Sequence, residues 1–195
     1  MKRLHACYCR SRHWRSTLDR LVPWALADVD LGDHVLELGP GHVPTIPLLR
    51  SRTRRVTAID TDAAIARLRC QPGLGLVRGD AASLPFATGT FSAVVAFTML
   101  HHIPTSELQQ QLFREVYRTL TPGGVFVGTD ARLSLSLWLF HLGETCACIP
   151  PDEAAARFAS AGFTNIVVER QARFFSFRAH ASVATAGILA ERAGQ

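Results

Sequence analysis

Glycines, carboxylates and imidazoles follow the successive short apolar runs of this chain. In order they are Gly39, Gly41, Asp60, Asp80, His101, His102 and Asp130. Glycine lets a ligand lie close to the backbone, a carboxylate accepts hydrogen bonds through two oxygens, and a near-neutral imidazole takes or gives a proton. If the runs are parallel strands, these groups meet at the edge where open α/β sheets bind ligands. The sequence therefore predicts one site built from several strand ends.

The spacing of the first glycines and of Asp60 favours a nucleoside ligand over a dinucleotide. The third glycine of the dinucleotide fingerprint falls at Pro44. Asp60 lies 21 residues after Gly39, close to the spacing at which a carboxylate binds both hydroxyls of a ribose. Asp80 follows the next apolar run, where its carboxylate can accept a hydrogen bond from the amino group of adenine.

Short apolar runs alternate with helical patterns between residues 33 and 130, which predicts a parallel sheet covered on both faces. A Rossmann-like, doubly wound α/β sheet of about seven strands is expected, with an antiparallel C-terminal hairpin. Pro23 is expected to kink or split the N-terminal helix 13–28. The predicted strands are 35–38, 56–60, 74–78, 91–97, 125–129, 165–170 and 174–180, and the other helices are 63–69, 106–120 and 151–161.

The arrangement predicts a single domain over residues 1–195. It has an Arg-rich helical arm at 1–30 and a candidate substrate cover at 131–150, both with apolar and aromatic residues. With 48% apolar and 19% charged residues, a disordered chain is excluded. The net charge of +5 permits contact with nucleic acid without arguing for it.

The cysteines and the apolar runs point to a reducing compartment. Five cysteines do not suggest a disulfide framework, and the first residues lack the apolar run of a signal peptide. The longest apolar stretch, Leu133–Leu142, is about half a membrane span. A cytoplasmic protein without integral membrane association is expected.

Five ordered motifs resemble those of class I S-adenosylmethionine-dependent methyltransferases, and most closely the small-molecule type 11 subgroup. The motifs are Val35-Leu36-Glu37-Leu38-Gly39-Pro40-Gly41, Ala58-Ile59-Asp60, Gly79-Asp80-Ala81-Ala82-Ser83-Leu84-Pro85-Phe86, Phe91-Ser92-Ala93-Val94-Val95 and Leu120-Thr121-Pro122-Gly123-Gly124. The resemblance implies an enzyme that uses S-adenosylmethionine and methylates a small acceptor.

The resemblance also implies which residues bind the cofactor. The glycine turn and Glu37 would hold its methionine part, Asp60 the ribose, and Asp80 with the Ala81 backbone the adenine. One departure is Val43, where the family commonly has a third glycine and where the larger side chain narrows the turn. The implied cofactor-binding residues are Glu37, Gly39, Pro40, Gly41, Asp60, Thr61, Asp80, Ala81, Phe97 and Thr98.

His101 and His102 are the candidate catalytic residues, since either could take a proton from the acceptor. The alternative is that His102 packs or caps the turn. Asp130 either faces substrate or caps a turn. No metal site is predicted, because Cys7-x-Cys9 with His5 and Cys146-x-Cys148 with His141 fit zinc spacing poorly.

Three functions stay open at this point. The first is methylation of a small, hydrophobic or aromatic acceptor. The second is RNA methylation, prompted by the basic arm, although Phe97-Thr98-Met99-Leu100 lacks the Asn/Asp-Pro-Pro-aromatic motif of amino-group nucleic-acid methyltransferases. The third is a non-catalytic binding or scaffold protein, prompted by Val43. The oligomeric state and the acceptor atom are not predicted.

Overall fold

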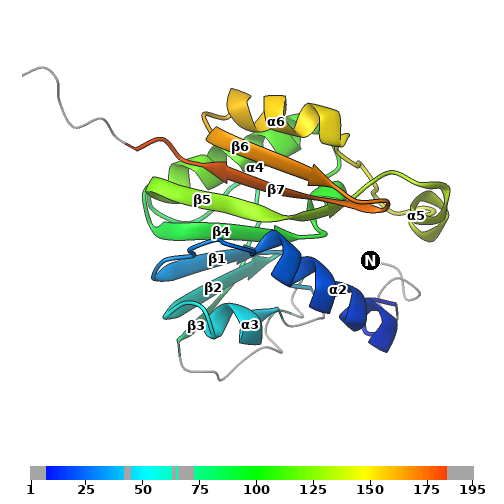
Figure 1. Ribbon diagram of the computed structural model, residues 1–195, viewed down its shortest axis with the longest axis horizontal. Coiled ribbons are helices and arrows are strands. Elements are labelled where there is room, and N and C mark those ends of the chain that lie inside the picture. The colour runs from blue at the N-terminus through cyan, green and yellow to red at the C-terminus, as the bar shows by residue number, and fades with distance from the viewer. Residues whose placement is uncertain (1–7, 42–44, 63–64, 66–72, 184–195) are drawn as a thin grey trace, which may run out of the picture.

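One seven-stranded sheet forms the centre of the molecule (Figure 1). The computed structural model describes residues 8–41, 45–62, 65 and 73–183. The strand order is β3-β2-β1-β4-β5-β7-β6, and the first five are parallel while β7 runs antiparallel to both neighbours. The predicted fold class is confirmed. The strands are β1 (His34–Leu38), β2 (Arg55–Asp60), β3 (Leu74–Arg78), β4 (Phe91–Phe97), β5 (Leu120–Ala131), β6 (Thr164–Arg170) and β7 (Phe174–His180).

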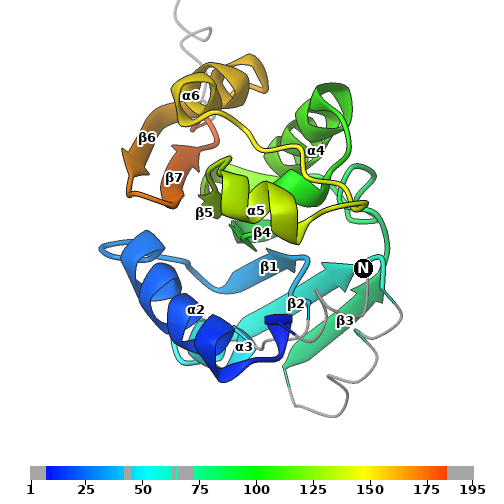
Figure 2. The same ribbon diagram turned by 90° about the vertical axis from the view of Figure 1, so that its right-hand side faces the viewer.

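Helices cover both faces of the sheet, with α2 and α3 on one side and α4 on the other (Figure 2). The strand β4 shows why both faces need cover. Its Ala93 and Val95 belong to the buried cluster beneath α2 and α3, while Val94 and Ala96 belong to the cluster beneath α4 and α6. All four side chains are fully buried, as expected for a strand at the centre of a parallel sheet. The helices are α2 (Arg12–Ala25), α3 (Ile46–Arg50), η2 (Leu100–His102, a 3₁₀ turn), α4 (Ser106–Thr119), α5 (Leu135–Phe140) and α6 (Pro151–Ser160).

Pro23 does not split the first helix, so the predicted split is wrong. The helix α2 begins after Ser11, whose hydroxyl accepts a hydrogen bond from the Trp14 amide, and it runs through Pro23 to Ala25. Because Pro23 lies in the last turn, its missing N–H removes a single hydrogen bond near the helix end. The Leu26 amide still donates to the carbonyl of Val22, which closes the turn.

The fifth strand is longer than the predicted 125–129. It begins directly after α4 and includes residues 120–124, which the sequence did not place in a strand. Its register with β4 shifts between the pairs Phe91/Leu120 and Ala93/Val125, so these residues form a bulge. The amide of Gly123 donates to the carbonyl of Ala181, which ties the bulge to the end of the last strand.

The remaining predicted elements agree with the structure to within about two residues. The C-terminal hairpin is antiparallel as predicted. The predicted helix 63–69 lies outside the described residues, apart from 65. The segment Leu133–Cys148, for which no helix or strand was predicted, contains the short helix α5, which lies beyond the ends of β4 and β5 (Figures 1 and 2). Among the described residues, no helix has the length and apolar character to cross a membrane.

A steric test of the sheet centre is available at Gly128, which lies in β5 between β4 and β7. A Cβ at this position would overlap the carbonyl oxygen of Ala96 and stand 2.9 Å from the ring of Phe177. We expect Gly128→Ala to lower the free energy of unfolding by about 3 kcal/mol, the upper range for overpacking a core. Urea denaturation followed by circular dichroism measures the change.

Gly89→Ala is the matched control. No heavy atom lies within 4 Å of the Cβ added there, so its cost comes from the positive φ of 66° alone, about 1 kcal/mol. Equal decreases in the free energy of unfolding of the two variants would show that the described contact of Gly128 with β4 is wrong.

Candidate active site

The loops after β1, β2, β3 and β4 surround one cavity of about 1000 Å³. The chain moves outward from β1 to β3 and then returns to place β4 on the other side of β1. The cavity therefore lies at the point where strand order reverses, which is where open α/β sheets bind ligands. All the residues predicted for the site line this cavity: Glu37, Gly39, Pro40, Gly41, Asp60, Thr61, Asp80, Ala81, Phe97, Thr98, His101 and His102.

The glycine turn after β1 needs glycine at both positions. Gly39 and Gly41 have φ values of 60° and 59°, a region that side chains with a Cβ rarely adopt. The Gly39 amide donates to the carbonyl of Ile59, and the Gly41 amide donates to a carboxylate oxygen of Asp60 at 3.2 Å. The turn is thus tied to the end of β2. Val43 lies outside the described residues.

Glu37 is a buried carboxyl group in the cavity wall, with 1% of its surface exposed. One oxygen accepts a hydrogen bond from the hydroxyl of Thr45, and the other, Oε2, has no hydrogen-bond partner among the described residues. Burial raises the pKa of Glu37 to about 7, although the Thr45 hydrogen bond opposes this and the nearby charge of Asp60 adds to it. A cation in the cavity would stabilise the ionised form.

Asp60 lies at the end of β2 with its carboxylate already oriented. Its two oxygens accept hydrogen bonds from the amides of Gly41, at 3.2 Å, and Asp62, at 2.9 Å. A carboxylate has about four lone-pair sites, so capacity for two further hydroxyl donors remains. Thr61 follows it on the exposed side, and its carbonyl accepts a hydrogen bond from Arg78.

Asp80 and Ala81 form the wall after β3. The Asp80 carboxylate accepts a hydrogen bond from the Ala82 amide at 2.9 Å, which makes a tight turn. Asp80 is exposed toward solvent, while Ala81 is buried and contributes to the core. The polar and apolar parts of this wall suit the amino edge and the face of a heterocyclic base.

Thr98, directly after β4, has an unusual backbone. Its φ is 54°, which is rare for a β-branched residue and costs on the order of 1–3 kcal/mol. The Thr98 amide donates to the carbonyl of Thr129 at 2.7 Å, and its hydroxyl bonds to the carbonyl of Phe97. These bonds hold the turn at the cavity, and sequence reasoning gave no sign of this conformation.

His101 is held by Asp130, a partnership that sequence reasoning missed. The Nδ1 atom of His101 lies 2.6 Å from Oδ1 of Asp130, and both side chains are buried. An ionised carboxylate only accepts hydrogen bonds, so Nδ1 carries the proton and the lone pair lies on Nε2. The sequence left Asp130 as either a substrate-facing or a turn-capping residue, and the structure instead pairs its buried carboxylate with His101. Its role as an orienting group depends on the pairing of β4 with β5.

The rest of the cavity wall comes from the N-terminal arm and from the segment after β5. Tyr8 contacts Phe140 edge to face, with 4.7 Å between ring centroids. Trp14 and Leu18 of α2 and Leu137 of α5 also line the cavity. The predicted cover segments thus meet over the site. Sequence reasoning had not named Tyr8, Met99, Arg132, Arg173 and Phe174, which also line it.

The fold and this site together define a Rossmann-like α/β protein with a nucleoside-binding edge. In the solved structures, the chain is similar to a methyltransferase in complex with the Trm112 activator of Haloferax volcanii. The TM-score is 0.74 at 16% identity, over 93% of this chain and 99% of that one. At this identity the likeness shows the fold.

The sequence comparisons give the family. The model of the type 11 "Methyltransferase domain" matches residues 36–128, nearly half of the chain. A probable S-adenosylmethionine-dependent methyltransferase of Mycolicibacterium smegmatis is 35% identical over 54% of this chain and 41% of its own length. A fatty-acid O-methyltransferase of the same organism is 37% identical over 55% of this chain and 40% of its own. These matches confirm the resemblance to the class I S-adenosylmethionine-dependent methyltransferases.

The match leaves part of the relatives uncovered. The chain spans about 40% of the length of these two curated relatives. The matched part ends within β5, so it contains the glycine turn, Asp60, Asp80 and both adjacent histidines. The residues that cover the cavity from α2 and α5 lie outside the family match.

The described residues fit S-adenosylmethionine. The buried Oε2 of Glu37 has no hydrogen-bond partner among the described residues, so it can accept a hydrogen bond from a donor such as an ammonium group. Among the described residues, a Cβ built on Gly41 would meet only the Gly39 carbonyl oxygen, at 3.9 Å, so these residues leave the turn open for a ligand against the backbone. Acceptor-only carboxylates at Asp60 and Asp80 suit hydroxyl and amino donors.

Glu37→Gln tests the buried carboxyl group. The cofactor's ammonium needs the ionised form, so the parent protein should bind S-adenosylmethionine roughly tenfold more tightly at pH 7.5 than at pH 6.0. In Glu37→Gln the affinity at pH 7.5 should fall and its dependence on pH should flatten. Isothermal titration calorimetry at both pH values measures this, and an unchanged pH dependence in the variant would contradict the assignment.

The same substitution should change stability without cofactor. The pKa of Glu37 is raised in the folded protein from its ordinary 4.5 to about 7. Its contribution to stability is therefore complete below pH 4.5 and is lost as the pH rises through 7. The melting temperature should therefore fall less between pH 5.5 and pH 8 in Glu37→Gln than in the parent, as measured by thermal denaturation.

Proposed function

We propose that this chain transfers a methyl group from S-adenosylmethionine to a small acceptor with an apolar or aromatic body. The observation that carries the proposal is the single cavity that joins a glycine turn, the buried Glu37 and Asp60 to an aromatic cover. When bound, the cofactor supplies a sulfonium methyl group, which passes to the acceptor's lone pair as the carbon–sulfur bond breaks and sulfur keeps the electron pair. The protein's task is to align the two molecules.

The cofactor half of the cavity is assigned to the residues of the four strand ends. Glu37 would bind the ammonium group, and Asp60 would bind the ribose hydroxyls beside Thr61. Asp80 and Ala81 would bind the adenine. The turn residues Gly39, Pro40 and Gly41, with the backbone of Phe97 and Thr98, would enclose the methionine part.

The acceptor half is assigned to the arm 1–30 and the segment 131–150, as parts of one domain with the sheet. Tyr8, Trp14 and Phe140 bring aromatic surface to this side of the cavity. Aromatic walls favour apolar ligands. The fatty-acid O-methyltransferase among the relatives supports the same acceptor class. An apolar wall suits a small molecule better than the phosphate backbone of RNA.

His101 is the residue we assign to activation of the acceptor. Its Nδ1 is held by Asp130, so its Nε2 lone pair is the reactive position, and the side chain lines the cavity. His102, half-buried and also on the wall, stands beside it with 4.2 Å between ring centroids. We therefore propose both His101 and His102 as catalytic residues.

The compartment we propose is the cytoplasm. Cys9, Cys146 and Cys148 are free thiols, which suits a reducing environment. Burial raises the pKa of Cys9 to about 11, so its thiol stays protonated and unreactive near neutral pH.

Methyl transfer is tested with radiolabelled S-adenosylmethionine and a panel of fatty acids, long-chain phenols and quinones. Bulk RNA is included as a separate substrate. We expect labelled product with at least one apolar acceptor and none with RNA. Cofactor binding without transfer to any acceptor would favour the non-catalytic alternative, and transfer to RNA alone would overturn the acceptor class.

Asp60→Ala tests the ribose contact. Losing hydrogen bonds to a charged group should cost about 1.5–3 kcal/mol of cofactor binding, or roughly a 10- to 150-fold rise in Kd. Asp33→Ala is the matched control, because Asp33 is exposed and precedes β1 at the opposite end of the sheet. Calorimetric titration with S-adenosylhomocysteine measures both. Parental affinity in Asp60→Ala would show that the cofactor lies elsewhere.

A further inference from the structure

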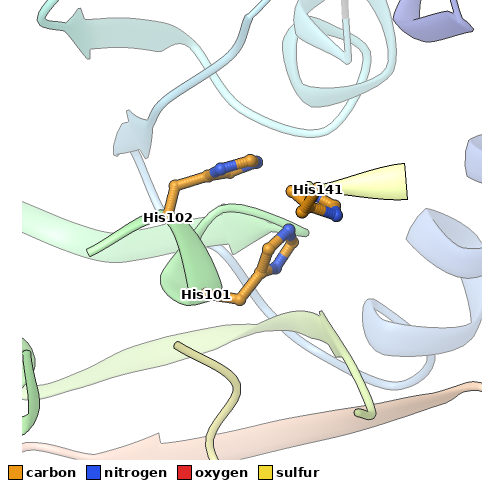
Figure 3. A group of neighbouring side chains, drawn as sticks. All are labelled: His101, His102 and His141. Atoms are coloured by element: carbon orange, nitrogen blue, oxygen red, sulfur yellow. The ribbon is translucent and has the colours of Figure 1, made fainter. Parts of the chain in front are cut away.

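Three histidines from two distant parts of the chain meet on the cavity wall (Figure 3). His101 and His102 belong to η2, and His141 directly follows α5. Each can offer one ring nitrogen such that these atoms all lie within 4.8 Å of one another. The ring centroids of His141 lie 5.2 Å and 5.3 Å from those of its two partners. The fold has thus placed three imidazoles around one point.

Hydrogen bonds at Nδ1 orient two of the three rings, those of His101 and His141. His101 uses Nδ1 toward Asp130, and His141 uses Nδ1 toward the carbonyl oxygen of Leu137, at 2.9 Å. Both partners are acceptors, so each Nδ1 carries a proton and each Nε2 carries a lone pair. A carboxylate or carbonyl behind a histidine is the usual arrangement around a ligated metal ion, because it sets the tautomer and raises the basicity of the ligand.

The charge of Asp130 also calls for a cation at this place. Its side chain is fully buried, and its Oδ2 has no hydrogen-bond partner among the described residues. Its Oδ1 accepts the hydrogen bond from His101, but a buried carboxylate with one unsatisfied oxygen is still costly. An ion bound to Nε2 of His101 would place positive charge across the imidazole ring from the Asp130 carboxylate. The backbone keeps this wall in place, since Gln109 donates to the carbonyl of Leu100 and the Ala147 amide donates to that of His101.

The spacing suits a tetrahedral ion after a small adjustment. Zinc binds histidine nitrogen at about 2.0–2.1 Å, which places two tetrahedral ligand atoms about 3.4 Å apart. The nitrogens here lie within 4.8 Å of one another, so ring rotation has to draw them together by at most about 1.5 Å to reach the zinc distances. Three imidazoles and one open position form a donor set found in catalytic zinc sites.

We propose that His101, His102 and His141 bind a divalent transition-metal ion of the zinc type, with an open coordination position toward the cavity. Imidazole ligands favour such ions over magnesium or calcium, which prefer oxygen. Sequence reasoning had paired His141 with Cys146 and Cys148. Those thiols lie 3.8 Å from each other, outside the histidine cluster, and burial raises the pKa of both, so they stay protonated.

The chemical role of this ion rests on the proposed function, in which the protein methylates a small acceptor. An acceptor hydroxyl or carboxyl oxygen would occupy the open position of the ion. The ion lowers the pKa of a bound hydroxyl, whose proton passes to solvent while the electron pair stays on oxygen. The histidines then act as ligands, and no imidazole has to accept that proton. The site therefore suits an acceptor hydroxyl group, whose oxygen can serve as the fourth ligand.

Metal binding is tested on the full chain, purified and freed of metal with a chelator. Calorimetric titration with Zn²⁺ should show one tight site per chain, and Co²⁺ should give the visible absorption of a tetrahedral complex. Mg²⁺ should not compete. His102→Ala and His141→Ala should each weaken Zn²⁺ binding at least 100-fold, with the fold checked by circular dichroism. Because His102 is half-buried, its variant should fold even if the other does not.

Two controls separate this site from other ligands. His180→Ala should bind Zn²⁺ like the parent, since His180 pairs with Val125, five residues before Asp130 along β5. The double variant Cys146→Ser, Cys148→Ser should also bind like the parent. The proposal is overturned by parental binding in both histidine variants, by loss of binding in the cysteine variant, or by no binding in the parent.

Cofactor titrations on the same samples keep the two proposals apart. Zn²⁺ binding without S-adenosylmethionine binding would support the metal site and contradict the proposed function. Binding of S-adenosylmethionine without Zn²⁺ would leave the methyltransferase proposal standing and overturn the metal site. In that case His101 would act directly through Nε2.

Discussion

The parallel pairing of β1 with β4 is the constraint on which the rest of the structure depends. The two strands run side by side from Val35 against Ala93 to Leu38 against Ala96, all of them buried. Strands in this position are covered on both faces, so their polar loops can open only at the strand ends. The pairing thereby sets the glycine turn after β1 opposite the strained backbone at Thr98, and a cavity has to form between them.

Under the proposed function, two buried carboxyl groups serve opposite sides of this cavity. Glu37 serves the cofactor side, where its pKa near 7 lets it respond to a cation. Asp130 serves the acceptor side, where it holds His101. Burial disfavours the ionised form of Glu37 in the empty protein. Such a cost is expected where a site is built to receive positively charged groups, and it is recovered when they bind.

Much of the fold was predictable because local patterns and tertiary structure agree. Short apolar runs identified all seven strands, and the residues implied to bind the cofactor lie at the ends of β1, β2, β3 and β4. The errors came where neighbouring elements override a local signal. The helix α2 tolerates Pro23 because this residue lies in its last turn. The segment around Gly123 becomes a bulge of β5, where the Gly123 amide donates a hydrogen bond to the carbonyl of Ala181. Neither effect is visible in the sequence alone.

The sequence by itself determined the methyltransferase fold and the cofactor edge, since each of those residues lies within a few positions of a strand end. Only the tertiary structure decided the acceptor side. His101 meets Asp130 because β4 pairs with β5, and His141 reaches both histidines because α5 lies beyond the ends of those strands. These partners are about 30 to 40 residues apart. No periodicity or spacing rule brings such residues together, because their proximity arises from the packing of whole elements.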